Sequence, residues 1–203
     1  MTDAPRSPYA SALGDRIAEL SPALRRYVDT IPAGFVGRGE GVFDRVGSRR
    51  WFLTPLLRWF ARRGVVPAGW HERVPFRIEN RTVEGTAVAC RRFDLPTGAF
   101  TMHDAVRATS RGTVVDRVGR PPVVGAEFAV RVAESALVLD SIAVGIRLGG
   151  LRLRLPEWVA PRIRLRERSV GDGQRVEFAM DLPLVGRIYE YAGTFTYRIE
   201  EDA

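Results

Sequence analysis

Apolar and polar side chains alternate with a period of two from residue 70 to the end of the chain, and this pattern most constrains the fold. Clusters of Gly, Pro, Asp and Asn divide the alternation into runs of about six to ten residues, as expected for strands joined by turns. The clearest pair is "IAVGIRLGGLRLRL", in which Gly149 and Gly150 form a two-residue turn that tolerates positive φ. The sequence therefore predicts a mostly antiparallel sheet.

The next hairpin, "RIRLRERSVGDGQRVEFAMDL", has a register that its charges can test. With a two-residue turn at 172–173, Arg168 faces Glu177, and apolar residues face each other on the other side of the hairpin. The same register places Glu167 on the apolar side, opposite Phe178. A carboxylate that points into an apolar interior needs a partner, so Glu167 is a candidate site residue.

Two helices are predicted before the sheet, within residues 9–30. Apolar residues recur there at spacings of three and four, which is typical of a helix with one buried face. Ser7 and Ser21 each precede a proline and suit the N-cap position. The segment therefore divides into two helices near Ser21.

Residues 49–64, "RRWFLTPLLRWFARRG", predict an amphipathic helix over 55–63, within a segment from 35 to 70 that also holds a strand. Thr54 suits the N-cap, and Gly64 suits the left-handed position that ends a helix. At about 1.5 Å per residue, this helix is far too short to cross a bilayer. Its apolar side either covers the core, which we favour, or lies on a membrane surface. The residues that would form this lid or membrane contact are Trp51, Leu56, Trp59 and Phe60.

All 31 basic residues are arginine, because the sequence contains no lysine. This excludes chemistries that need a lysine amine, such as Schiff-base catalysis, pyridoxal-phosphate catalysis and P-loop phosphate binding. The formal net charge is +7, but 24 acidic residues are interspersed with the arginines, so nucleic acid is not a favoured partner. One cysteine, Cys90, and two histidines, His71 and His103, cannot build a structural zinc site or an internal disulfide. We predict no metal and no cofactor.

The alternation also predicts which polar side chains point into the interior. The stretch "AVACRRFD" turns Arg91 inward, "AFTMHDAV" turns Asp104 inward, and "RIYEYAGTFTYR" places its arginine and tyrosines on an inward face. Such groups either orient a ligand in an apolar pocket, with an arginine pairing an anionic group, or form internal ion pairs that only fix the fold. The candidate ligand-binding residues are Arg91, Asp104, Glu167, Arg187, Tyr189 and Tyr191.

Four motifs stand out along the chain: "GRGEG", "ACRRF", "LPEWVAPRIRLRE" and, as the most specific, "PLVGRIYEYAG". Together they resemble the domain of unknown function 4166 family of bacterial proteins, over roughly residues 13–195. Members of that family occur alone or fused behind nucleotide-binding, reductase-like domains, so the resemblance implies an accessory or ligand-handling role. It implies no catalytic residue, because no activity is established for the family.

These observations predict a single α+β domain over residues 1–203. Its N-terminal helices pack on a strongly curved, mostly antiparallel sheet over 73–199, which either stays open or closes as a barrel. The chain has no apolar stretch of the length of a membrane span, and its first 20 residues lack the pattern of a leader peptide. A cytoplasmic location is therefore expected.

The favoured function is the binding of a small apolar or amphipathic molecule inside the curved sheet. Two alternatives stay open. One is an enzyme, or an accessory module of a nucleotide-dependent reductase, in which Glu167 or Asp104 acts as acid or base. The other is a peripheral protein of the membrane surface.

Overall fold

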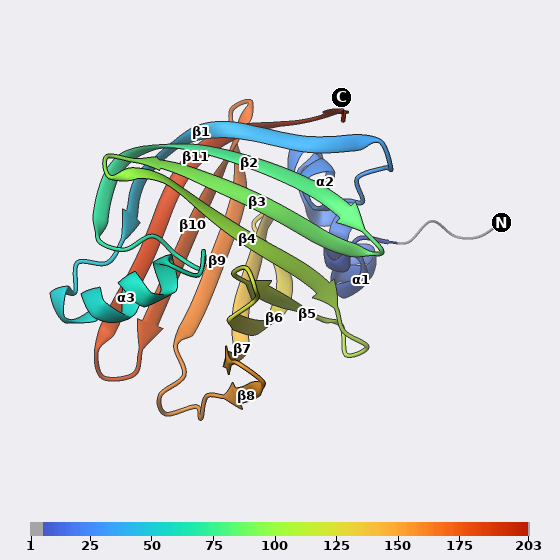
Figure 1. Cartoon of the computed structure of the whole chain (residues 1–203). Helices are drawn as coiled ribbons and strands as arrows, with labels where there is room; N and C mark the ends of the chain where they lie inside the picture. The colour runs from blue at the N-terminus through green and yellow to red at the C-terminus, as the bar shows by residue number, and fades with distance from the viewer. Residues whose placement is uncertain (1–5, 203) are drawn as a thin grey trace.

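The computed structural model describes residues 6–202, and Figure 1 shows short helices followed by a long series of strands. The helical part begins with α1 (Pro8–Leu13), the 3-10 segment η1 (Gly14–Glu19) and α2 (Pro22–Val28). Between the first two strands lie the 3-10 turn η2 (Trp51–Leu53) and α3 (Thr54–Ala61). The strands are β1 (Phe35–Gly47), β2 (Trp70–Val83), β3 (Thr86–Leu95), β4 (Gly98–Ala108), β5 (Thr113–Val118), β6 (Val124–Ala133), β7 (Ala136–Leu148), β8 (Leu151–Arg154), β9 (Arg162–Val170), β10 (Gly173–Leu182) and β11 (Gly186–Glu201).

The sheet closes on itself. Its strands follow the order β6-β5-β4-β3-β2-β1-β11-β10-β9-β7, and β6 also pairs with β7. Within the described residues, ten antiparallel strands therefore form a closed barrel, and β8 extends the sheet beyond it by pairing with β7. Closure removes the free strand edges that an open sheet would have to protect. The predicted α+β fold is confirmed, with the sheet in its closed form.

Because neighbouring strands are antiparallel, the connections fall alternately at the two ends of the barrel (Figure 1). One end, called here the α1–α2 end, is covered by α1 and α2, which contact β4, β5, β6, β9 and β10. The opposite end, called the α3 end, carries α3 and the connections on the same side. These connections are the segments 48–69, 96–97, 119–123, 149–161 and 183–185.

The two N-terminal helices begin as the sequence predicts. The Oγ of Ser7 accepts a hydrogen bond from the backbone N–H of Ala10 at 3.0 Å, and that of Ser21 accepts one from Leu24 at 3.4 Å. A proline follows each cap in the first turn. Leu24 is completely buried, so α2 closes its end of the barrel with its apolar face.

Replacing Ser21 with alanine should lower the free energy of unfolding by about 1 kcal/mol. The variant loses the cap of α2 and the 2.6 Å hydrogen bond between the hydroxyls of Ser21 and Ser169. Urea denaturation of the wild type and the variant measures the difference. Ser11→Ala in α1, where the side chain is exposed, is the control and should change little. Equal losses in the two variants would contradict a stabilising role for the cap.

The interior of the barrel is filled mainly by aromatic side chains. The rings of Phe43, Phe76 and Phe93 contact one another, with centroids 4.4 to 5.5 Å apart. All three are almost completely buried, and burial of such a side chain contributes about 1.5–3 kcal/mol. A second buried cluster, which includes Leu24 and Val114, lies beneath α1 and α2. Side chains therefore occupy most of the space that an empty barrel would offer.

The hairpin formed by β7 and β8 has the predicted turn. Gly149 and Gly150 connect the strands, and Leu153 lies opposite Ile146. Gly149 has a φ of 60°, in the left-handed region where glycine carries no steric cost.

The hairpin formed by β9 and β10 differs from the prediction by one position. Its turn also has two residues, but they are 171–172, since Gly173 already pairs with Val170. Gly171 has a φ of 56°, which the first central residue of a type II′ turn requires. Glu167 consequently lies opposite Val176, and the predicted pairing with Phe178 is wrong. The displacement preserves the alternation of faces, so Glu167 still points inward.

The helix predicted over 55–63 is present as α3, with a different start. The turn η2 leads directly into it, so Thr54 is already helical and does not cap the helix. Gly64 has the predicted left-handed conformation, with a φ of 65°. Leu57 is buried, whereas Leu56 keeps half of its surface exposed. Within residues 6–202, every helix falls short of the length and apolarity that crossing a bilayer demands.

Candidate functional site

Four ionisable side chains from four different strands gather inside the barrel, and we call them the interior cluster. They are Arg91 on β3, Asp104 on β4, Asp116 on β5 and Glu167 on β9. Each of the three carboxyl groups interacts electrostatically with the guanidinium of Arg91. The cluster therefore combines one positive group with three acidic groups in a largely apolar interior.

Arg91 and Asp104 form an ion pair. Asp104 lies opposite Ala89 and Arg91 lies opposite Met102, which makes the two charged residues diagonal neighbours on the inner face of β3 and β4. The Nη1 of Arg91 donates a hydrogen bond to Oδ2 of Asp104. The Asp104 side chain is 2% exposed, and a charge so deeply buried persists only when it is paired.

Glu167 contributes a buried carboxyl group that is only partly satisfied. Its Oε2 has no hydrogen-bond partner among the described residues. Burial raises the pKa of this carboxyl to about 7; Arg91 opposes the rise and Asp104 adds to it. Gln174, a diagonal neighbour on β10, is also buried, and neither atom of its amide group has a partner in the described chain. This side of the cluster offers unused hydrogen-bonding groups.

Asp116 belongs to the cluster but is not among the candidates predicted from the sequence. Burial and the neighbouring Asp104 carboxylate raise its pKa to about 7, against the effects of Arg91 and of two backbone N–H groups. Its Oδ1 lacks a partner within residues 6–202. The alternation in "TVVDRV" places Asp116 on the same face as Val114 and Val118, and this is the signal that could have identified it. In the structure Val114 is completely buried, so this face points inward.

Three tyrosines from three elements line the cluster. Tyr9 comes from α1, Tyr27 from α2 and Tyr191 from β11, and burial raises the pKa of all three phenols. The ring of Tyr27 packs edge-on against Phe195 and Tyr197, with centroids 5.8 and 4.9 Å away. The helices at the α1–α2 end therefore form part of the wall around the charged groups.

Two small cavities adjoin Arg91. One, of about 30 Å³, extends from Asp104 toward the α1–α2 end, where Asp29 is exposed and Arg81 is half-buried. The other, of about 10 Å³, lies between Arg91 and Glu167 and has aromatic walls. Such volumes hold roughly one or two water molecules. The cluster thus approaches the surface at the α1–α2 end, but the space around it is narrow.

The structure brings together Arg91, Asp104, Glu167 and Tyr191 from the predicted ligand-binding residues. Tyr189 is also buried, but it serves another contact. Its hydroxyl donates a hydrogen bond to the backbone carbonyl of Pro67 at 3.2 Å, which fastens the segment after α3 to the barrel.

Arg187 does not point inward, contrary to the prediction. It pairs with Asp181 at 2.9 Å and with Glu190 at 3.1 Å, and almost half of its side chain is exposed. Met180 lies opposite Tyr189, whereas the next residue, Asp181, lies opposite Arg187, so one extra residue bulges out of β11. Because of this bulge, Arg187 and Tyr189 no longer point to the same face of the strand. Tyr189 stays inside the barrel, and Arg187 points to the outer surface.

The predicted lid residues lie at the α3 end and do not line either cavity at Arg91. Trp51 and Leu56 are exposed. Trp59 and Phe60 are half-buried and pack edge-on, with ring centroids 5.0 Å apart. The helix α3 therefore covers the end of the barrel that lies farther from the interior cluster.

Comparison with known protein families identifies the chain. The family model described as "Domain of unknown function (DUF4166)" matches residues 20–195. The chain belongs to the DUF4166 family. The DUF4166 match includes all four members of the interior cluster but begins after α1, which contributes Tyr9. No curated protein matches the chain.

Proposed function

We propose that this barrel binds a small amphipathic molecule whose polar end carries a positive charge or several hydrogen-bond donors. The observation that carries the proposal is the imbalance of the interior cluster, in which the buried carboxyl groups of Asp104 and Glu167 and the partly buried one of Asp116 share one arginine. Buried acceptor atoms that lack donors cost free energy, and a ligand that donates hydrogen bonds to them removes this cost.

The charge of the cluster selects the polar end of the ligand. Arg91 is already paired with Asp104, so an anionic group would meet the carboxyl groups of Asp116 and Glu167 without a free cation. An ammonium or amidinium group would instead favour the ionised forms of both acids. The sequence allowed an arginine to pair with an anionic group of a ligand, whereas the arrangement around Arg91 and Asp104 favours a cationic one.

The apolar part of the ligand takes space that Tyr27 now fills. The cavities of about 30 and 10 Å³ hold no more than water, and the ring of Tyr27 lines both of them. The ligand enters at the α1–α2 end, where the larger cavity approaches the surface, and α2 moves outward as it binds. Replacement of Tyr27 by alanine should therefore enlarge the site.

Calorimetric titration with three probes of equal chain length tests the proposal: n-octylammonium, n-octanol and octanoate. We expect n-octylammonium to bind most tightly and octanoate to bind least. Glu167→Gln should weaken n-octylammonium binding by about tenfold, whereas Tyr27→Ala should strengthen it. Glu177→Gln removes an exposed carboxylate from β10 and serves as the control.

The pH dependence gives a second readout. A cationic ligand binds the ionised form of Glu167, so its affinity should rise between about pH 6 and about pH 8, and binding should release protons. Preferred binding of octanoate, or equal binding by the wild type and Glu167→Gln, would contradict the proposal. Native mass spectrometry of freshly purified protein, followed by organic extraction, would identify a ligand retained from the cell.

A further inference from the structure

Large apolar side chains protrude from several connections at the α3 end. Trp51 is 83% exposed, Trp158 is 76% exposed and the side chain of Leu184 is completely exposed. Phe52 and Leu56 each keep about half of their surface exposed. We call these five residues the apolar rim. Isolated exposed apolar residues are ordinary, but five on three connections at one end of a barrel indicate an interaction surface.

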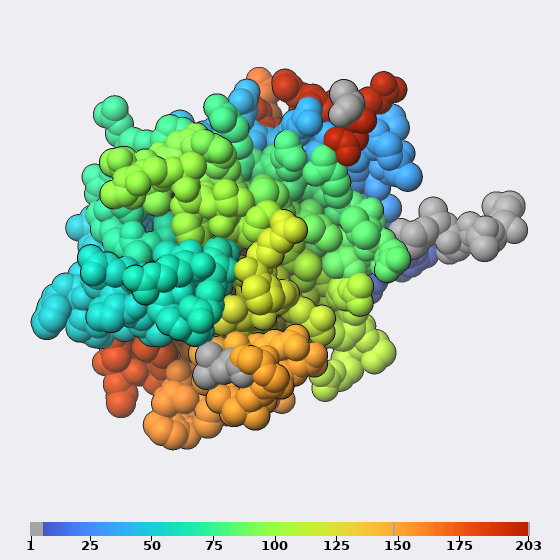
Figure 2. Space-filling model, in the orientation of Figure 1, coloured from blue at the N-terminus to red at the C-terminus, as the bar shows by residue number. Residues whose placement is uncertain are grey.

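Hydrogen bonds and strand pairing hold these connections side by side. The guanidinium of Arg50, next to Trp51, donates hydrogen bonds to the carbonyl oxygens of Arg187 and Val185, at 3.2 and 3.1 Å. This places the turn η2 beside the β10–β11 turn that carries Leu184. The segment with Trp158 enters β9 next to the end of β10. In Figures 1 and 2 these segments lie along the left and lower sides of the molecule, away from α1 and α2.

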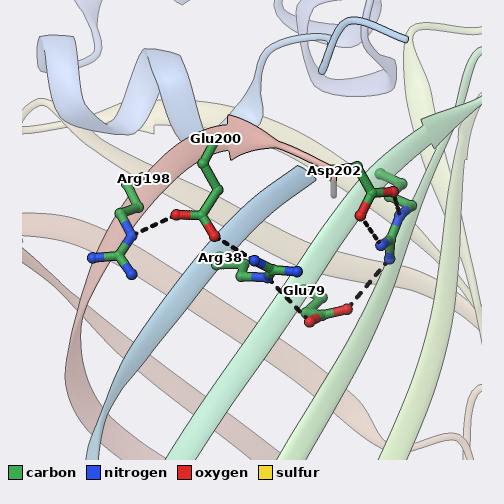
Figure 3. Close-up of polar contacts among 6 residues, drawn as sticks. Arg38, Glu79, Arg198, Glu200 and Asp202 are labelled. Carbon is green, nitrogen blue, oxygen red and sulfur yellow. Dashed lines mark hydrogen bonds and ion pairs between the residues drawn. The ribbon is translucent and has the colours of Figure 1, made fainter. Parts of the chain in front are cut away.

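Unpaired arginines occur at both ends of the described barrel, for example Arg25 and Arg26 on α2. Those around the rim differ in lying beside exposed apolar side chains. Toward the α1–α2 end, arginines and acids on β1, β2 and β11, together with Asp202 just after β11, form a continuous network, which Figure 3 shows. At the α3 end, several arginines have no carboxylate partner within the described part of the chain. They include Arg58, Arg62, Arg63, Arg147, Arg152 and Arg154.

The acids at the α3 end offset only part of this charge, since Glu157, next to Trp158, adds one exposed carboxylate. Glu72 and Asp181 are already paired with Arg49 and Arg187. A groove of about 320 Å³ between the β5–β6 connection and the β7–β8 hairpin has four arginines and no carboxylate among its lining residues in the described chain. Two of these, Arg152 and Arg154, flank the exposed Leu153 on β8. Cationic and apolar side chains thus alternate on one surface.

We propose that the α3 end of the barrel docks on an anionic lipid surface. The apolar rim inserts at the depth of the headgroups, and the unpaired arginines bind lipid phosphates above it, as in other proteins that lie in the membrane interface. The rim consists of separate protruding tips rather than one groove. Separate tips suit a deformable lipid surface, and the uncompensated positive charge selects anionic lipids. This inference is independent of the ligand proposed for the interior.

Sedimentation with lipid vesicles tests the inference. The vesicles consist of phosphatidylcholine alone or of an equimolar mixture with phosphatidylglycerol. The wild type should sediment with the mixed vesicles, remain in solution with phosphatidylcholine alone and dissociate as salt is added. Trp51→Glu/Leu184→Glu and Arg152→Glu/Arg154→Glu should each weaken binding to mixed vesicles by at least about tenfold.

The matched control places two glutamates at the opposite end of the barrel. Val83→Glu/Val170→Glu replaces two exposed apolar residues there and should bind like the wild type. Quenching of wild-type tryptophan fluorescence by brominated lipid gives a readout without any substitution, because Trp51 and Trp158 would enter the headgroup region. The inference is overturned if the wild type ignores anionic vesicles, if its fluorescence is not quenched, or if the control loses as much binding as the rim variant.

Discussion

Replacement of Arg91 by methionine should lower the free energy of unfolding by about 3–5 kcal/mol at about pH 8. Arg91 is the partner of Asp104, whose side chain is 2% exposed and therefore gains little from water. Without the guanidinium, the folded protein must either hold an unpaired buried carboxylate or bind a proton to neutralise it. The loss should shrink at lower pH, where protonation of Asp104 is less costly. Urea denaturation at several pH values measures both effects.

Two further variants separate the buried ion pair from a general effect of losing an arginine. Arg131→Met removes an arginine whose partner, Asp140, is 32% exposed and also paired with Arg164. Such a surface pair should contribute less than about 1 kcal/mol. The double variant Arg91→Met/Asp104→Leu removes both buried charges and should recover much of the lost stability. Equal losses for Arg91→Met and Arg131→Met would show that the folded protein does not need Arg91 to hold the Asp104 carboxylate in its interior.

The alternation of side chains was sufficient to predict most of the interior cluster. Arg91 and Asp104 lie on regular stretches of β3 and β4, where a period of two decides the face. The sequence predicts that the Glu167 side chain points inward, but it places the turn of the β9–β10 hairpin one residue too far along the chain. Its face is nevertheless correct, because this displacement changes the cross-strand partner and preserves the alternation.

Local irregularities and tertiary packing explain what the sequence did not reveal. A bulge in β11 turns Arg187 outward, and the alternating pattern of the strand gives no sign of it. The closure of the barrel depends on pairings between strands far apart in the chain, such as β1 with β11. The size of the cavities depends on how the aromatic rings and Tyr27 pack, which periodicity does not describe.

Stability should fall as the pH rises through the neutral range, because the folded protein holds protons that the unfolded chain releases. The pKa of Glu167 is about 7 in the folded protein, against 4.5 for an ordinary glutamate. Between these values the folded state binds one more proton, so the free energy of unfolding decreases with increasing pH and levels off above about pH 7. The decrease from this group is roughly 3 kcal/mol. Asp116, with a pKa of about 7 against 3.8, acts in the same direction.

Glu167→Gln isolates one of these two contributions. Glutamine resembles the protonated acid, so the variant should match the wild type near about pH 4.5 and exceed its stability above about pH 7, by up to roughly 3 kcal/mol. Urea denaturation across this range measures the difference between the two curves. Glu177→Gln removes the same charge from the solvent-facing side of β10, where Arg175 lies 3.2 Å away, and its curve should run parallel to that of the wild type. If the curve of Glu167→Gln also runs parallel to that of the wild type, then Glu167 is ionised in the folded protein at neutral pH. Asp116 would then be the acid of the interior cluster that holds a proton there.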